Sequence, residues 1–379
     1  MAKRTGVLII TGSWPPMRCG VGDYSYNLAV AIAAAGLRVF VYTSNGGTFR
    51  AFSRSHDLEV LSLASGWGIL SVLRSFWGLK RLLTEKKIDW VNIQYPAIGY
   101  GYSLGPQLLI VLLKVFLNVG VITTLHEFTQ ARSLRKISQI PFLLFSDKLI
   151  FTAENEATVI KALAKLSGFG KPSYSVIPVG SNIPVNTDLQ VVKRKGFVVF
   201  FGLFYPGRQL EFVAEIFKAI AQKKDDVTFG MIGDVHPKYL RYYEEIRGLF
   251  EGVLPKEKLE WYIGETPENV AKVLCQANVA ILPYPDGASF RRTTLIAALM
   301  GGVPVISTKG AVTPAELSEG FNIFFASDRS SFSQKASVIL SNPELADAIS
   351  VNTKKICRQF SWQSIAARYV SFIQGQDAR

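Results

Sequence analysis

The chain has 379 residues, of which 49% are hydrophobic, and its formal charge is +13. One hydrophobic core seldom supports a chain of this length, so we expect two domains. The charge favours anionic partners without choosing among phosphates, nucleic acid and membranes. The three cysteines, Cys19, Cys275 and Cys357, are widely spaced. They fit neither a disulfide framework nor a zinc site, which favours a reducing compartment.

The N-terminal part alternates β-branched runs with amphipathic stretches. The runs that we expect to form strands are 6–12, 38–43, 89–95, 120–126 and 148–153. Residues 24–36 have a helical pattern that stops at Gly36. The first part of the chain therefore predicts a parallel sheet with helices between its strands.

Two apolar segments are candidates for a signal peptide and for a membrane span. The segment 1–14 lacks a long apolar core with a small-residue cleavage site, so it indicates a buried strand and a cytoplasmic protein. The longest apolar run, 103–124, is interrupted by Pro106, Lys114 and Asn118. Because a membrane span needs about 20 mostly apolar residues, this run predicts a buried or surface-lying helix that leads into a strand.

A second alternating series follows a stretch rich in Pro, Asn and charge. Its expected strands are 196–202, 227–233, 258–264, 279–284 and 303–308, and its clearest helices are 209–224 and 267–277. Two such series predict two domains of α/β class, each with a parallel sheet. The predicted domains are residues 1–178 and 196–359, joined by a hinge at 179–195.

The loop after the first strand contains Pro15, Pro16, Gly20 and Gly22 ahead of a helix. Small residues there allow the backbone to approach a phosphate at the positive end of the helix. The loop does not have the G-x-G-x-x-G pattern of dinucleotide-binding proteins. It is therefore a candidate phosphate-binding turn or an ordinary connection from strand to helix, and the sequence leaves both open.

His126, one of three histidines, directly follows the predicted strand 120–126. Ligands bind at the carboxyl ends of parallel strands, so its side chain is expected at the mouth of the sheet. An imidazole at that place can donate or accept a hydrogen bond near neutral pH. A purely structural role for this histidine is the alternative.

Arginines stand at the starts of two predicted helices in the second domain. Arg208 follows the strand that ends at Gly202, and Arg291 and Arg292 precede a helix that contains no acidic residue. A positive side chain at a helix N-terminus is unfavourable unless an anion lies between them. Thr293 and Thr294 are expected to cap the second helix and to hydrogen-bond phosphate oxygens. With no D-x-D and no Cys/His cluster, we expect no metal.

The order of these features resembles that of GT-B glycosyltransferases of the family 4 type over nearly the whole chain. The segments similar to the family are "PPMRCGVGDYSYNLAVAIAAAGLRVFVYT", "VITTLHEF", "VIPVGSNI", "FFGLFYPGRQLE", "ANVAILPYPDGASFRRTTLIAALMGGVPVIST" and "FSWQSIAARYVSFI". The resemblance implies two Rossmann-like parallel-sheet domains that face a central cleft, with the helix 360–379 crossing back to the first domain. It also implies a retaining, metal-independent enzyme that uses a nucleotide sugar and no cofactor.

The resemblance also implies roles for individual residues. His126 would lie beside the transferred sugar and bind it, and Arg208 would stabilise the leaving diphosphate as a catalytic cation. The helix starts with Gly20, Gly22, Thr293 and Thr294 belong to the implied donor site.

This chain departs from the family at three positions. Two glutamates of the donor signature are replaced by Ser289 and Ala297, and the arginine expected after Gly202 is Leu203. We expect Arg291 or Arg292 to replace the missing cation and Asp286 to replace the sugar-facing carboxylate. Glu265 is either a base or ribose contact or a solvated loop residue.

The acceptor side of the implied site is less defined. Tyr95 and Tyr100 suit stacking on sugars, and Arg132 and Arg135 lie downstream of His126. The basic residues favour a lipid-linked saccharide at an anionic membrane over a soluble glycan, although a solvated face is the ordinary reading. The expected partners are thus a UDP- or GDP-sugar, a glycan or lipid-linked acceptor and peripheral contact with the inner face of the plasma membrane, in bacterial surface-polysaccharide synthesis.

Two other classes of protein remain open from the sequence. The missing glutamates would suit a nucleotide-sugar-binding protein without turnover. The net charge alone would suit a nucleic-acid-binding protein, but the chain lacks interleaved aromatic and basic platforms, so we expect no nucleic acid.

Overall fold

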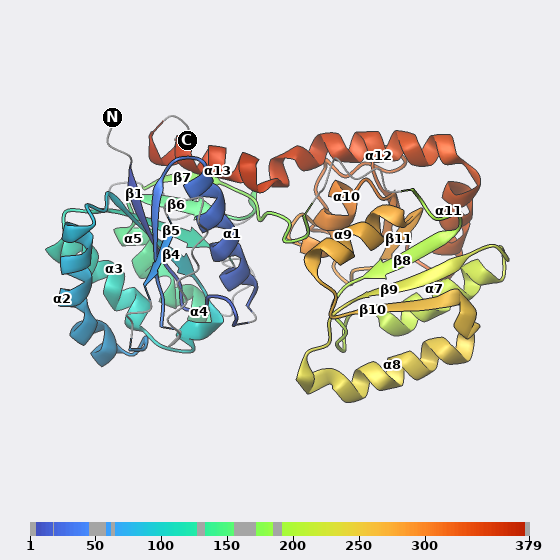
Figure 1. Ribbon diagram of the computed structural model, residues 1–379, viewed down its shortest axis with the longest axis horizontal. Coiled ribbons are helices and arrows are strands. Elements are labelled where there is room, and N and C mark those ends of the chain that lie inside the picture. Colours follow the sequence, from blue (N-terminus) through green and yellow to red (C-terminus); the bar gives the residue numbers. More distant parts are fainter. Residues whose placement is uncertain are drawn as a thin grey trace. The chain divides into compact units, whose positions relative to one another are not determined.

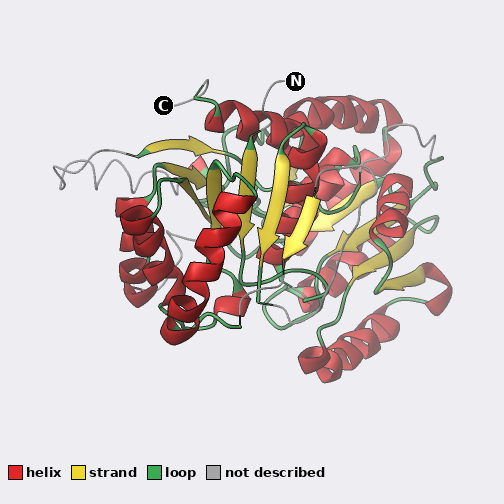
Figure 2. Cartoon of the chain, turned by 60° about the vertical axis from the view of Figure 1, so that its left-hand side comes forward, coloured by secondary structure: helices red, strands yellow, loops and turns green. Residues whose placement is uncertain are grey.

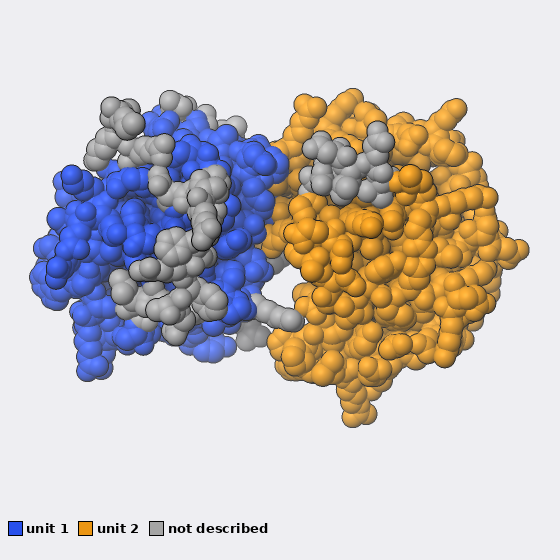
Figure 3. All heavy atoms as spheres, in the orientation of Figure 1, with its two compact units in different colours: residues 1–180, 361–379 blue, residues 181–360 orange. Residues whose placement is uncertain are grey.

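The computed structural model describes residues 5–17, 19–44, 58–61, 65–126, 133–154, 172–184 and 192–375. The chain divides into two compact units, which Figure 3 colours separately. Unit 1 contains Met1–Gly180 and Ser361–Arg379, and unit 2 contains Ser181–Phe360. The predicted hinge, 179–195, includes residues 185–191, which lie outside the described residues. Each unit is a parallel sheet with helices, so the predicted α/β fold with two Rossmann-like domains is confirmed.

Unit 1 is built on a seven-stranded parallel sheet with the order β3-β2-β1-β4-β5-β6-β7. Figure 2 shows the strands of the chain in yellow and its helices in red. The strands of this sheet are β1 (Gly6–Ile10), β2 (Arg38–Tyr42), β3 (Leu58–Leu61), β4 (Trp90–Tyr95), β5 (Gly120–Leu125), β6 (Lys148–Phe151) and β7 (Ser173–Val176). The two edge strands, β3 and β7, were not predicted. Their sequences, LEVL and SYSV, are short and partly polar because an edge strand is only partly buried, so the apolar run that marks a central strand is missing.

Helices cover both faces of this sheet. The helices in the described residues of unit 1 are α1 (Gly20–Ala34), α2 (Ile69–Glu85), α3 (Gly105–Phe116), α4 (Ser133–Ser138), α5 (Ile140–Phe145) and α13 (Trp362–Ile373), with a 3₁₀ helix at Ile98–Tyr100. Alternate residues of β1 point to opposite faces: Val7 belongs to the apolar cluster that includes α1 and α13, and Leu8 belongs to the cluster that includes α2, α3 and α5. Figure 1 labels these helices around the sheet.

Helix α3 and strand β5 occupy the longest apolar run, as predicted. Within the described part of the chain, no helix is both long and apolar enough to span a membrane.

The last helix, α13, is attached to the sheet of unit 1 by buried polar contacts. Asn92 Nδ2 on β4 donates to the Tyr369 hydroxyl at 2.9 Å. Lys148 Nζ on β6 donates to the Phe372 carbonyl at 2.6 Å, and Arg368 Nη2 donates to the Val176 carbonyl at 2.5 Å. Three strands are thus linked to one helix, which explains why the end of the chain belongs to the unit formed by its beginning.

Unit 2 contains a six-stranded parallel sheet with the order β10-β9-β8-β11-β12-β13. Its strands are β8 (Phe197–Phe201), β9 (Thr228–Gly233), β10 (Leu259–Ile263), β11 (Val279–Leu282), β12 (Val305–Ser307) and β13 (Phe324–Phe325). Strands β8 to β12 agree with the five predicted runs. Three 3₁₀ helices connect elements of this unit: Pro237–Tyr239, Lys256–Lys258 and Arg358–Phe360.

The helices of unit 2 form two groups. They are α7 (Leu210–Ala221), α8 (Leu240–Val253), α9 (Pro267–Gln276), α10 (Thr293–Met300), α11 (Arg329–Ser341) and α12 (Pro343–Cys357). Helix α7 packs beside α8 and α11, and α10 packs beside α9 and α12 (Figure 1). Both groups pack on one continuous apolar core.

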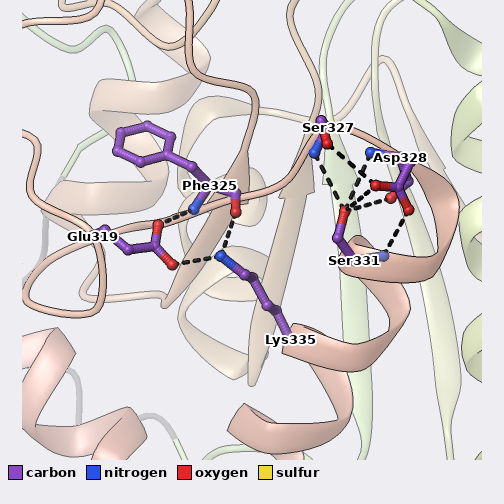
Figure 4. Close-up of polar contacts among 6 residues, drawn as sticks. All are labelled: Glu319, Phe325, Ser327, Asp328, Ser331 and Lys335. Atoms are coloured by element: carbon purple, nitrogen blue, oxygen red, sulfur yellow. Dashed lines mark hydrogen bonds and ion pairs between the residues drawn. The ribbon is translucent and has the colours of Figure 1, made fainter.

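The short edge strand β13 is held by polar contacts with α11 (Figure 4). Lys335 of α11 forms an ion pair with Glu319 and also donates to the Phe325 carbonyl, and the Phe325 amide donates to Glu319 Oε2. Asp328 caps α11 by accepting a hydrogen bond from the Ser331 amide at 2.9 Å. These contacts add to the packing of Phe324 and Phe325 against the core of unit 2.

Loss of the Tyr369 hydroxyl should destabilise unit 1. A Tyr369→Phe variant leaves Asn92 Nδ2 buried without its partner, which should lower the free energy of unfolding by about 1–2 kcal/mol, measured by urea denaturation. Tyr26→Phe removes the hydroxyl of an exposed tyrosine and serves as the control. Equal stability of Tyr369→Phe and the wild-type protein would contradict this account of how α13 is attached.

Candidate active site

Each sheet has one point where the strand order reverses. This switch point lies between β1 and β4 in unit 1 and between β8 and β11 in unit 2. In open parallel sheets, ligands bind at the carboxyl ends of the strands beside such a point. Arg208 follows β8, and Tyr284 and Asp286 follow β11, so the switch point of unit 2 collects several of the predicted donor residues.

Arg208 is buried, with 6% of its surface exposed. Among the residues that the structure describes, its Nε has no hydrogen-bond partner and no carboxylate forms an ion pair with it. The close fit requires a glycine at the end of β8, because a Cβ on Gly202 would lie 2.4 Å from Arg208 Nη2. The strand-end glycine seen in the sequence therefore accommodates the guanidinium group.

Tyr284 supports the two arginines of the site. The ring centroid of this fully buried residue lies 5.1 Å from Cζ of Arg208 and 5.1 Å from Cζ of Arg292. Its hydroxyl shares a hydrogen bond of 2.9 Å with Thr294 Oγ1, and its amide donates to Thr308 Oγ1 at 2.9 Å. Burial raises the pKa of the Tyr284 hydroxyl, and the nearby Arg208, Thr294 and Arg292 oppose that shift.

The energy balance at Arg208 favours an anion. A cation–π contact contributes about 0.5–2 kcal/mol, whereas the burial of an unpaired charge costs several kcal/mol. Arg208 contacts the rings of Tyr284 and, at 5.9 Å, Phe200. The rings offset only part of the cost, so the site is suited to a negatively charged ligand.

Arg292 differs from Arg208 because it has a carboxylate partner. Its Nη2 forms an ion pair with Asp286 Oδ1, and both side chains are partly exposed. Two of the predicted donor residues are therefore in direct contact, and an incoming phosphate would compete with Asp286 for Arg292. Arg291 is half-buried and precedes Arg292, the N-cap residue of α10.

The predicted caps of α10 are wrong in detail. The N-cap residue is Arg292, without a side-chain cap, and Thr293 is the first helical residue. Thr294 is engaged with Tyr284, so neither threonine caps the helix. Because the N-cap residue makes no side-chain cap hydrogen bond, the first amide groups of α10 are available to an anionic ligand in the part of the chain that the structure describes.

Two residues of the site were missed in the sequence. Tyr284 ends an apolar strand, and nothing in its neighbours indicates that two arginines converge on it. Gln209 adopts a left-handed conformation, with φ 56° and ψ 36°, and precedes α7. Its buried Oε1 has no hydrogen-bond partner among the described residues. A backbone angle cannot be deduced from a glutamine in the sequence.

The other predicted donor residues of unit 2 are less closely linked. Ser289 is buried, and so is Ala297. Glu265 is exposed beyond β10, the edge strand, and accepts a hydrogen bond from Asn269 Nδ2 at 3.0 Å. The described residues contain no group of three His, Cys, Asp or Glu side chains that could hold a metal ion.

His126 directly follows β5 in unit 1, and its amide continues the ladder by donating to the Tyr95 carbonyl at 3.0 Å. Its Nε2 lies 3.0 Å from Gln94 Oε1, and Gln94 Nε2 donates to Thr124 Oγ1. Since the amide oxygen only accepts, Nε2 carries the proton and Nδ1 keeps its lone pair. The ring meets Tyr24 edge-on, with centroids 4.7 Å apart, and desolvation lowers the pKa of His126 to about 3.

The glycines of the first loop have different surroundings. Gly20 starts α1, and a Cβ added to it would meet no described atom within 4 Å. Gly22 lies against the backbone of Ser13, where a Cβ would come within 3.2 Å. A side chain at Gly22 would thus press on the backbone of the chain itself. The N-cap residue of α1, Cys19, supplies no side-chain cap, so the amide groups at this helix start resemble those of α10.

The predicted role of Tyr95 and Tyr100 as sugar-stacking residues is wrong. Their exposed fractions are 7% and 4%, and their rings stack on each other in the core of unit 1. The Tyr100 hydroxyl donates to the Ile10 carbonyl, and Gln107 donates to the Tyr95 hydroxyl. Neither ring offers a free face to a sugar. Arg132 and the side chain of Arg135 lie outside the described residues.

Comparison with known families agrees with this geometry. The family described as Glycosyltransferase Family 4 matches residues 19–180, and that described as Glycosyl transferases group 1 matches residues 195–342. Between them, these matches cover most of both parallel-sheet units. The chain belongs to the family 4, group 1 glycosyltransferases of GT-B fold.

Solved structures show the same fold over nearly the full length. A sucrose-phosphate synthase from Thermosynechococcus elongatus has a TM-score of 0.72 at 17% identity, covering 98% of this chain and 99% of its own. A glycosyltransferase from Rickettsia africae has a TM-score of 0.72 at 13% identity and 99% coverage of both chains. Anabaena Alr3699/HepE in complex with UDP has a TM-score of 0.68 at 14% identity, covering 98% of this chain and 100% of its own. No curated protein sequence matched the chain.

The depressed pKa of His126 predicts a pH dependence of stability. The folded protein keeps this imidazole neutral, whereas the unfolded chain binds a proton below about pH 6.5. Stability contributed by neutral His126 is therefore present above pH 6.5 and decreases below it, by at most about 1.4 kcal/mol per pH unit.

This dependence can be measured by comparing urea denaturation of wild-type protein and a His126→Gln variant between pH 7.5 and 5. The variant should lose less stability than the wild-type protein as the pH falls. Parallel curves for the two proteins would show that His126 is protonated in the folded state.

Proposed function

We propose that the protein transfers a sugar, with retention of configuration and without a metal ion, from a UDP- or GDP-sugar to a glycan or lipid-linked saccharide in bacterial surface-polysaccharide synthesis. The observation that carries the proposal is the buried guanidinium group of Arg208, which has no carboxylate partner among the described residues and lies at the switch point of unit 2. A nucleoside diphosphate would supply the missing negative charge.

The diphosphate fits the residues around Arg208. Arg208 and Arg292 contact one tyrosine ring, so both cations are near the same place, and α10 starts beside them without a side-chain cap. Charge develops on the leaving diphosphate when the glycosidic bond breaks. Cations and amide groups held in position for that charge stabilise the transition state, usually as the largest single contribution.

Retention and metal independence follow from the same arrangement in this proposal. The arginines would take the place of a divalent cation at the diphosphate, and their positive charge would assist departure of the leaving group on the face that the acceptor attacks. Asp286, released from Arg292 when the phosphate binds, would be available to contact the transferred sugar. Ser289, next to this loop, and Glu265 at the edge of the sheet are further candidates for donor contacts.

A uridine nucleotide is the favoured donor. HepE, which shares the fold, has been solved with UDP and with UDP-glucose. These complexes support a nucleotide-sugar donor, and the proposal includes GDP-sugars as well as UDP-sugars.

His126 would bind the transferred sugar in this reaction. Its imidazole is neutral and its Nε2 donates to Gln94, so Nδ1 remains as a hydrogen-bond acceptor for a sugar hydroxyl. A ring with such a low pKa is a poor proton donor near neutral pH, which favours binding over acid catalysis.

A surface of unit 1 supports a lipid-linked acceptor. Helix α2 exposes Ile69, Leu70, Leu73 and Trp77, with exposed fractions of 67% for Leu70 and 66% for Trp77. Phe76 of α2 contacts Phe116 at the end of α3, which is also exposed and extends this surface. We call this set of five exposed residues, Ile69, Leu70, Leu73, Trp77 and Phe116, the α2 surface.

The charges of α2 fit an anionic bilayer. The helix carries Arg74, Lys80 and Arg81, and its one acidic residue, Glu85, pairs with Arg81 at 2.6 Å. An amphipathic helix with apolar and basic side chains on its outer face binds at the interface of anionic membranes. Contact through the α2 surface would bring unit 1 to a lipid-linked saccharide.

Substitution of Arg208 should separate stability from donor binding. Arg208→Met removes a buried, unpaired charge, so the free energy of unfolding should be unchanged or up to about 2 kcal/mol higher. Affinity for UDP or GDP and their sugars should fall at least about tenfold, because a charge-assisted hydrogen bond contributes about 1.5–3 kcal/mol.

Thermal-shift titrations and isothermal calorimetry measure both effects, and the anomeric configuration of the product is read by NMR. Arg241→Met, at an exposed arginine of α8, is the matched control and should change neither quantity. Undiminished nucleotide affinity in Arg208→Met would rule out the proposed diphosphate site.

The membrane contact should depend on the α2 surface. The double variant Leu70→Glu, Trp77→Glu should bind vesicles that contain phosphatidylglycerol at least about tenfold more weakly than wild-type protein in sedimentation assays, because each side chain contributes about 1.5–3 kcal/mol on burial. High salt should weaken wild-type binding.

The matched control is Val338→Glu, Val351→Glu, which places the same charges at two exposed apolar residues of unit 2. Equal vesicle binding by the wild-type protein and the α2 double variant would rule out the α2 surface as the membrane contact. No binding by either protein would favour a soluble glycan acceptor.

A further inference from the structure

Gln209 adopts a conformation that its place in the fold does not explain. Among the described residues, the non-glycine residues with positive φ are Lys87 and Gln209. Lys87 lies just beyond the C-cap of α2, where left-handed residues commonly end helices. Gln209 instead precedes α7, at an N-cap position where the extended conformation is usual.

The side chain of Gln209 does not compensate for this strain. It forms no cap hydrogen bond with α7, and its buried Oε1 has no partner among the described residues. The residue before it, Arg208, is more than nine-tenths buried and has an Nε that lacks a partner in the same part of the chain. Strain in a backbone persists where the surrounding structure holds it, and it is often found at ligand sites.

The two unpartnered atoms have complementary chemistry. Arg208 Nε–H is a donor that needs an acceptor, and Gln209 Oε1 is an acceptor that needs a donor. They belong to neighbouring residues at the carboxyl end of β8, beside the start of α7. A ligand that satisfies both presents an acidic oxygen close to a hydroxyl group, as a sugar joined to a phosphate does.

We propose that Gln209 is a donor-binding residue, whose side-chain amide accepts a hydrogen bond from a hydroxyl of the nucleotide sugar while Arg208 binds the adjacent phosphate. This inference rests on the proposed function, because it assumes a nucleotide-sugar donor. In this proposal Gln209 binds a hydroxyl group of the donor. Ser289 and Ala297, which stand in place of the two glutamates of the donor signature, have no carboxylate for that role.

Two variants test the role of the amide by calorimetry with UDP-glucose and GDP-mannose. Gln209→Gly suits positive φ and removes the amide, so its melting temperature should equal or exceed that of the wild-type protein while affinity for the bound nucleotide sugar falls at least about fivefold. Gln209→Glu keeps the side-chain length but adds a negative charge beside the diphosphate, and affinity should fall at least about tenfold.

Inorganic pyrophosphate tests the role of Arg208 separately from that of Gln209. It carries the phosphate without the sugar hydroxyl, so Gln209→Gly should bind it within about twofold of the wild-type affinity. Gln222→Glu places the same charge at the exposed opposite end of α7 and should leave all affinities unchanged.

The outcomes are distinguishable. If the wild-type protein binds neither nucleotide sugar, the proposed function fails and this inference fails with it. If it binds one of them and Gln209→Gly binds it equally well, only the role of Gln209 is overturned. A lower melting temperature together with weaker binding of every ligand, pyrophosphate included, would instead make Gln209 a structural residue.

Discussion

A buried guanidinium group without a counter-charge is unfavourable, and unit 2 places one at the switch point of its sheet. Arg208 is held there by close packing on Gly202 and by the rings of Phe200 and Tyr284, interactions that recover only part of the cost of desolvation. The residues around Arg208 fit a binding site for an anion. The ring of Tyr284 also contacts the guanidinium group of Arg292. Helix α10 begins beside this ring, and its N-cap residue makes no side-chain cap hydrogen bond.

The two units contribute different chemistry. Unit 2 provides positive charge at the switch point, which suits a diphosphate. Unit 1 provides a neutral imidazole and a chain of buried polar groups that runs from His126 through Gln94, Thr124 and Asn92 to Tyr369. This chain of hydrogen bonds sets the tautomer of His126 and connects it to the last helix. The hydrogen bonding of His126 thus depends on a network that extends to Tyr369, more than two hundred positions later in the sequence.

Much of the fold could be predicted because parallel strands buried on both faces leave continuous β-branched runs. The runs around β1, β4, β5, β8 and β11 are of this kind, and their alternation with helices specifies two parallel sheets. The edge strands β3 and β7 were not predicted because each pairs with one strand among the described residues and because their own residues are partly polar. The prediction for Tyr95 and Tyr100 was wrong for a related reason. A tyrosine near the end of a strand can stack on a sugar if its ring is exposed, but here the core of unit 1 encloses both rings.

Local chemistry alone identified the classes of residue at the site. Glycines at strand ends, a histidine after a strand and arginines at helix starts each follow from short-range rules about strands, helix dipoles and charge, and they are readable in a dozen residues. The rest depended on contacts between distant segments. The approach of Arg208 to Tyr284 arises only when β8 and β11 lie side by side. Burial and partner identity are properties of packing across the sheet, so no single stretch of sequence determines them.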